Sequence, residues 1–107
     1  MITFEIHQEA LKAAEQACAD FESNHPNFRD ACGFSWVDCF EKGNTKMGKS
    51  FVRVGFKKSY TGGYTLWNPG GTNSQSISLK EAGTQAYVDT VKKYLPEAKL
   101  YASSRLD

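Results

Sequence analysis

Two stretches of helical periodicity, near opposite ends of the chain, constrain its fold more than any other feature. In residues 5–23, small and apolar side chains recur every three or four positions opposite a glutamate-rich face, which predicts an amphipathic helix. In residues 78–95, Ser78 and Glu81 have the spacing of a capping box, and Pro96 prevents further helix. Each helix therefore has one apolar face to bury against the rest of the chain.

Short segments rich in aromatic and β-branched residues lie between and after these helices. Residues 31–40, ACGFSWVDCF, predict a strand, and because apolar side chains fall on both alternating faces, we expect a central strand covered on both sides. On this interpretation Trp36 is a core residue. Tyr64 to Trp67 and residues 98–102 predict two further strands, and residues 68–74 are rich in turn-forming types.

Two interpretations compete for residues 45–58. As a strand, Val52, Val54 and Phe56 alternate with basic residues, and a hairpin would return along Tyr64 to Trp67. As a helix, Thr45 caps the start and Gly55 ends it. The local pattern slightly favours the hairpin.

The charges are divided unevenly along the chain. Residues 1–41 contain two basic and eight acidic residues (net −6), whereas residues 42–107 contain eleven basic and four acidic residues (net +7). No acid occurs from position 42 to 67. Such a one-sided field favours acidic partners or polyanions. The alternative is that the two halves neutralise each other in the fold.

Length and hydropathy bound the class of protein. The chain has 107 residues, 40% of them hydrophobic, which suits a single domain over residues 1–107. No stretch approaches the roughly 20 apolar residues that span a bilayer, and the N-terminus lacks the pattern of a signal peptide. These features predict a soluble cytoplasmic protein.

The cysteines and histidines suggest no catalytic or metal site. Cys18, Cys32 and Cys39 form no C-x-x-C pair and have no ligand spacing to either histidine. We expect core thiols, no metal and no cofactor. A non-enzyme is favoured because no nucleophile, base and acid form a catalytic pattern. The alternative is an enzyme that uses Cys32 or Cys39.

Basic and aromatic residues alternate through positions 46–67, a mixture typical of surfaces that bind phosphates and stack on bases. Alternation alone leaves open whether Tyr64 and Trp67 face the core. The glycines before the last helix predict a loop whose backbone N–H groups could hold an anion, and the alternative is an ordinary turn. The candidate ligand-binding residues are Lys46, Lys49, Arg53, Lys57, Lys58, Tyr60, Tyr64, Trp67, Gly70, Gly71, Ser78 and Arg105.

Five separated stretches, in this order and spacing, resemble a known family: ACGFSWV, GNTKMGKSF, KKSYTGGYTLWNPG, QSISLKEAGTQAY and SSRLD. Over residues 31–107 they are similar to small bacteriophage and prophage proteins of unknown function. The resemblance implies no catalytic residues, but it implies a helix over residues 45–54. The order is then α-β-α-β-α-β, for which we expect a small α/β (or α+β) sandwich of three strands and three helices, with β-α-β units and partly parallel pairing.

Three functional hypotheses follow. The leading one is a non-enzymatic phage-type accessory protein in the host cytoplasm that binds a host component, an acidic protein or nucleic acid, through residues 46–67. The second is a protein that holds a nucleotide or other anion in the loop of residues 68–78. The third is the cysteine-dependent enzyme. We expect no membrane partner, and a homodimer that covers a sheet edge is compatible with the pattern.

Overall fold

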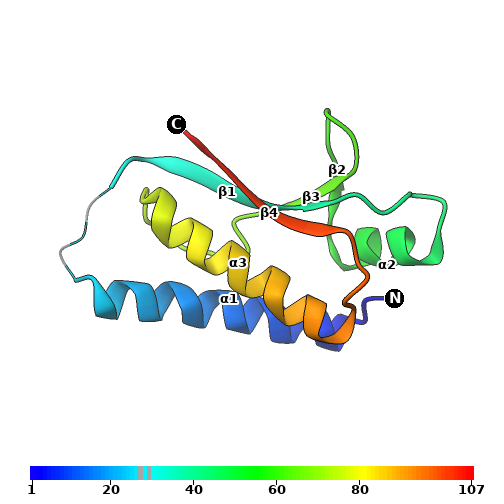
Figure 1. Ribbon diagram of the computed structural model, residues 1–107, viewed down its shortest axis with the longest axis horizontal. Coiled ribbons are helices and arrows are strands. Elements are labelled where there is room, and N and C mark those ends of the chain that lie inside the picture. The colour runs from blue at the N-terminus through cyan, green and yellow to red at the C-terminus, as the bar shows by residue number, and fades with distance from the viewer. Residues whose placement is uncertain (27, 29) are drawn as a thin grey trace.

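Three helices lie on one side of a four-stranded sheet, and the hairpin of the second and third strands projects on the other side (Figure 1). This computed structural model describes residues 1–26, 28 and 30–107. In chain order the elements are α1 (Phe4–Asn24), β1 (Gly33–Cys39), α2 (Lys46–Val54), β2 (Lys57–Lys58), β3 (Tyr64–Trp67), α3 (Ile77–Tyr94) and β4 (Leu100–Leu106).

The sheet has the order β2-β3-β1-β4, and all neighbouring strands are antiparallel. β1 and β2 therefore run parallel with β3 between them, and β3 and β4 run parallel with β1 between them. This is the connectivity of the split β-α-β, or ferredoxin-like, arrangement, preceded here by α1.

The predicted α+β class with three helices is confirmed, with four strands rather than three. The expectation of parallel neighbours is wrong. The helix α2 connects β1 to β2, and α3 connects β3 to β4. In each case one strand lies between the two connected strands and pairs antiparallel to both.

The helix implied for residues 45–54 is confirmed as α2, and the strand interpretation of Val52, Val54 and Phe56 is wrong, although a hairpin to β3 follows the helix. The Thr45 side chain accepts a hydrogen bond from the Gly48 N–H at 3.1 Å and so caps α2. The helix ends at Gly55, whose φ of +126° is open to glycine but rarely to other residues. β2 follows at once, and the Ser59 N–H donates to the Gly63 carbonyl at 3.0 Å to close its hairpin with β3.

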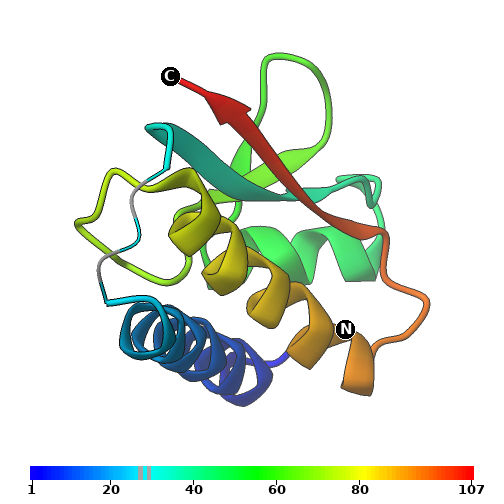
Figure 2. The ribbon, with the colours of Figure 1, turned by 60° about the vertical axis from the view of Figure 1, so that its left-hand side comes forward.

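α3 lies between the sheet and α1 (Figure 2). α3 is capped by Ser76, so the prediction that Ser78 is the N-cap is wrong. The Ser78 hydroxyl donates to Asp30 instead, and Glu81 accepts a hydrogen bond from Ser104. None of the described helices is long and apolar enough to cross a membrane.

The core fills the space between the inner face of the sheet and the helices. Val37 and Cys39 of β1 are fully buried there, together with Phe51 and Tyr87. Polar groups in this layer are paired: the Ser35 hydroxyl donates to Thr84 at 2.8 Å. Burial of apolar surface with satisfied polar groups is the main source of stability for such a layer.

The expectation that β1 is covered on both sides is wrong. Its residues are alternately buried and half-buried, so only one of its faces meets the helices. Trp36 lies on the other face and is not a core residue. β4 also extends farther than predicted, because Ser103 to Leu106 pair with β1 instead of forming a tail.

Candidate functional site

The face of the sheet that points away from the helices is the candidate site, and we call it the open face. Side chains directly opposite each other in antiparallel strands share a face, so the register defines its rows. The first row is Lys57, Thr65, Asp38 and Tyr101, the second is Trp67, Trp36 and Ser103, and the third is Phe34 and Arg105.

Aromatic rings form the floor of the open face. The rings of Trp36 and Trp67, on the two central strands, stack with centroids 4.9 Å apart, and Phe34 meets Trp67 edge to face at 6.0 Å. Trp67 remains 52% exposed. Phe40 and Tyr101 form a second ring pair at 5.8 Å. Exposed aromatic side chains that contact one another mark a candidate binding surface.

Cations surround this floor. Lys57, Lys58 and Arg105 line a groove of about 540 Å³ between the hairpin and the sheet, together with Trp67 and the exposed Tyr60. Lys57 and Arg105 belong to the rows of the open face, whereas Lys58 lies opposite the inward-pointing Tyr64. The Arg105 guanidinium also lies 5.5 Å from the centroid of the Phe34 ring. Within residues 1–26, 28 and 30–107, no salt bridge engages these three cations. Their charges are available to a ligand.

Asp38 is the one acid in the rows of the open face. Its carboxylate accepts a hydrogen bond from the Trp36 Nε1–H at 3.0 Å and another from the Ser103 hydroxyl. The two donors lie on different oxygens, Oδ1 and Oδ2. They hold the carboxylate in place while it also lines the groove.

The structure separates the other predicted basic residues from this site. Lys46, Lys49 and Arg53 are exposed on α2, on the helical side of the sheet (Figure 1). Tyr64 points inward and packs against the core. Of the predicted residues, the open face and its groove therefore bring together Lys57, Lys58, Tyr60, Trp67 and Arg105.

The predicted anion loop has a different arrangement. Gly70 is buried, and a Cβ added to it would lie 2.5 Å from the Cys18 Sγ. Gly71 is exposed at a φ of +65° in the turn that its N–H closes on Asn68. The Ser78 N–H at the start of α3 donates to Asp30 at 3.0 Å. The protein's own carboxylate thus occupies the helix N-terminus, and hydrogen bonds from Ser76 and then Ser78 lower the pKa of Asp30.

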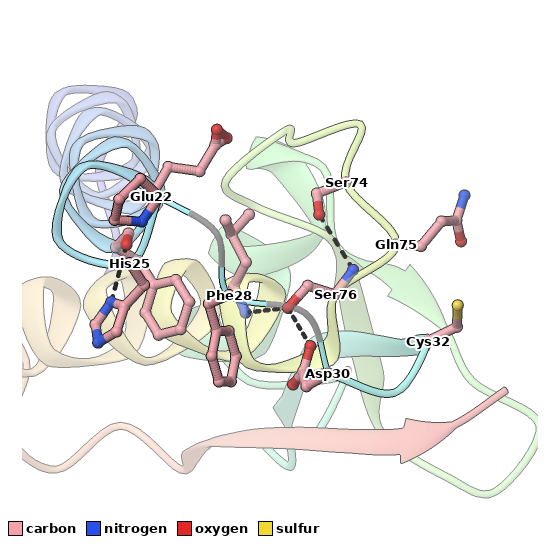
Figure 3. A pocket seen from close by; sticks show the side chains of 11 residues that line it. Glu22, His25, Phe28, Asp30, Cys32, Ser74, Gln75 and Ser76 are labelled. Atoms are coloured by element: carbon pink, nitrogen blue, oxygen red, sulfur yellow. Dashed lines mark hydrogen bonds between the residues drawn. The ribbon is translucent and has the colours of Figure 1, made fainter.

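A second hollow of about 490 Å³ lies beside Asp30, between the end of α1 and the loop before α3 (Figure 3). His25 lines it, but its Nδ1 is hydrogen bonded to the Phe21 carbonyl at 3.0 Å. Figure 3 shows Cys32 on the far side of the hollow from His25. No cysteine–histidine pair is formed there.

The cysteines differ from one another. Cys18 and Cys39 are buried as predicted, whereas Cys32 is exposed, so its assignment to the core is wrong. Burial raises the pKa of both buried thiols, that of Cys39 to about 11. Among the described residues no group of three histidine, cysteine or acidic side chains could hold a metal ion.

Sequence reasoning missed several residues of the open face, namely Phe34, Trp36, Asp38, Phe40, Tyr101 and Ser103. The signal for the first three was the period of two in ACGFSWVDCF, which places them on one face of a strand. The β4 residues had no local signal, since their place depends on pairing with β1.

Comparison of the chain with models of protein families, with curated proteins and with solved structures finds no match, so the candidate site is defined by its own geometry.

Proposed function

We propose that this chain is a non-catalytic binding protein that holds single-stranded nucleic acid on the open face. One observation carries the proposal: Trp36 and Trp67 stack on the two central strands, with Lys57, Lys58 and Arg105 around the same groove. Aromatic faces for bases and cations for phosphates are the two parts that such a site requires.

The shape of the face favours single strands over a duplex. Rings that lie on a sheet can stack only on bases that are not already stacked in a helix. Reading a duplex would require an element that enters a groove, and the helices lie on the opposite side of the sheet (Figure 2). Charge complementarity with phosphates also favours nucleic acid over an uncharged apolar partner.

The alternative of an anion in the loop of residues 68–78 has less support. Asp30 already accepts hydrogen bonds from Ser76 and Ser78 at the start of α3. A second anion there would meet a carboxylate at close range, and like charges repel.

The test is fluorescence anisotropy with labelled eight-nucleotide DNA and RNA of mixed sequence, at about 50 mM salt, where phosphate contacts are strong. Two tyrosines provide a matched pair of variants: Tyr101 on the open face is 52% exposed and Tyr94 on α3 is 49% exposed. We expect Tyr101→Ala and Trp67→Ala each to weaken binding about 5- to 150-fold, the range for one base–aromatic stack. Tyr94→Ala should leave binding unchanged.

Two results would overturn the proposal. One is equal loss of binding in Tyr94→Ala and Tyr101→Ala. The other is no binding of either oligonucleotide by a protein that light scattering shows to be a dimer and that Trp67→Arg converts to a monomer. The second result would assign the open face to another copy of this chain.

A further inference from the structure

We infer that Asp38 makes the open face selective for guanine. The inference rests on the proposed function and adds to it the choice of base. An acid among the cations of the groove opposes the binding of phosphates, whereas it can accept hydrogen bonds from the donor groups of a base.

Besides the two hydrogen bonds that Asp38 accepts within the protein, its carboxylate can accept more. An ionised carboxylate offers about four acceptor positions, two on each oxygen. The Trp36 Nε1–H occupies one on Oδ1, and the Ser103 hydroxyl occupies one on Oδ2. One position on each oxygen remains, so Asp38 has the capacity to accept two further hydrogen bonds, one on each oxygen.

Guanine is the base whose edge matches two adjacent acceptors. Its Watson–Crick edge presents N1–H and the N2 amino group next to each other, and in a single strand this edge is accessible. Adenine and cytosine present one amino group beside a ring nitrogen acceptor, and uracil and thymine present one N–H between two carbonyls. In each of those bases an acceptor would face the carboxylate, which is unfavourable.

The neighbouring positions of the row support the same base. Lys57 lies opposite Thr65, which lies opposite Asp38, so the small Thr65 separates a cation from an acid. The strands that carry Lys57 and Asp38, β2 and β1, are about 10 Å apart because β3 lies between them. Lysine pairs with the O6 and N7 acceptors of guanine. The acid therefore faces the N1–H and N2 donors of a guanine placed between the two side chains, and the cation faces its O6 and N7 acceptors.

Pre-organisation strengthens the argument. Trp36 and Ser103 fix the carboxylate before a ligand arrives, so less side-chain entropy is lost on binding. A site that already holds its acceptors in position discriminates against bases that lack the matching donors.

The experiment measures the affinity of five labelled RNA pentamers that differ at the central position: 5′-UUGUU-3′ and its variants with adenine, cytosine, uracil or inosine. Inosine keeps N1–H but lacks the 2-amino group. For the unaltered protein we expect guanine to bind about tenfold or more tightly than adenine, cytosine or uracil, with inosine in between. In Asp38→Asn the affinity for the guanine pentamer should fall about tenfold, to that of the adenine, cytosine and uracil pentamers, so that the guanine preference disappears.

Asp89→Asn is the matched control, since it makes the same charge change on the exposed side of α3. It should keep the guanine preference. If all five pentamers bind the unaltered protein equally, or if Asp38→Asn keeps the preference, the inference about Asp38 is wrong and the proposed function stands. If none of the pentamers binds at about 50 mM salt, the proposed function itself fails.

Discussion

At the scale of single residues, the three thiols should differ sharply in reactivity. Cys39 is fully buried and its pKa is raised to about 11 by burial, so at pH 8 only about one molecule in a thousand carries the reactive thiolate. Cys18 is also buried, whereas Cys32 is exposed. We expect iodoacetamide at pH 8 to modify Cys32 alone in the native protein, as measured by mass spectrometry. Denaturant should expose all three, and rapid native labelling of Cys39 would instead support a cysteine-dependent activity.

The buried His7 gives stability a defined dependence on pH. Its Nδ1 lies 2.7 Å from the Tyr87 hydroxyl, and burial lowers the pKa of His7 below 6.5. The unfolded state therefore binds a proton first as the pH falls through 6.5, and the free energy of unfolding falls by at most about 1.4 kcal/mol per pH unit. Above that pH this group causes no change.

His7→Gln tests this expectation, because glutamine offers an acceptor to Tyr87 but takes up no proton in this range. Thermal melts at pH 7, 6 and 5 should show a smaller loss of Tm for the variant than for the unaltered protein. Parallel losses in the two proteins would show that His7 is not the group responsible.

At the scale of elements, the contact of α1 with α3 and the loop before it depends on small residues. A Cβ added to Gly70 would lie 2.5 Å from the Cys18 Sγ, and one added to Gly83 would lie 2.8 Å from it. Gly70→Ala should therefore destabilise the fold by about 1–3 kcal/mol through overpacking. In Gly70→Ala/Cys18→Ala the clash is relieved, so urea denaturation should give a double-mutant loss smaller than the sum of the two single losses. Additive losses would contradict this packing.

The same scale shows how much of the fold the sequence could predict. Helical periodicity is local, which is why α1 and α3 could be predicted from the chain alone. For α2 the local pattern slightly favoured a strand, and only the resemblance implied the helix. Strand pairing is not local. No pattern within residues 45–67 shows that β3 lies between β1 and β2. That position depends on which distant strand the hairpin pairs with.

The candidate site could be predicted in part for the same reason. The basic and aromatic character of Lys57, Lys58 and Trp67 is visible in the sequence, and these residues do line one groove. Their separation from Lys46 depends on the side of the sheet to which α2 packs. The period of two in ACGFSWVDCF places Asp38 on this face, but its role in the site depends on hydrogen bonds from Trp36 and Ser103, which the sequence does not show.

At the scale of the whole molecule, the fold distributes the basic half of the chain over two sides of the sheet. Lys57 and Arg105 lie in the rows of the open face and line its groove, whereas Lys46 and Lys49 are exposed on α2 behind the sheet. All four contribute to the long-range field, but only the first pair lies where phosphates would contact a strand bound to the aromatic floor.

This division predicts which basic residues set the salt dependence of oligonucleotide binding. Each phosphate contact adds about 0.7 to the slope of log affinity against log salt for a single strand. Lys57→Ala/Arg105→Ala should therefore reduce the slope by about 1.4, measured by anisotropy from 50 to 200 mM salt. Lys46→Ala/Lys49→Ala removes the same charge from α2 and should leave the slope nearly unchanged. Equal reductions in the two double variants would mean that the strand does not follow the groove, since a ligand held only by net charge would sense both pairs alike.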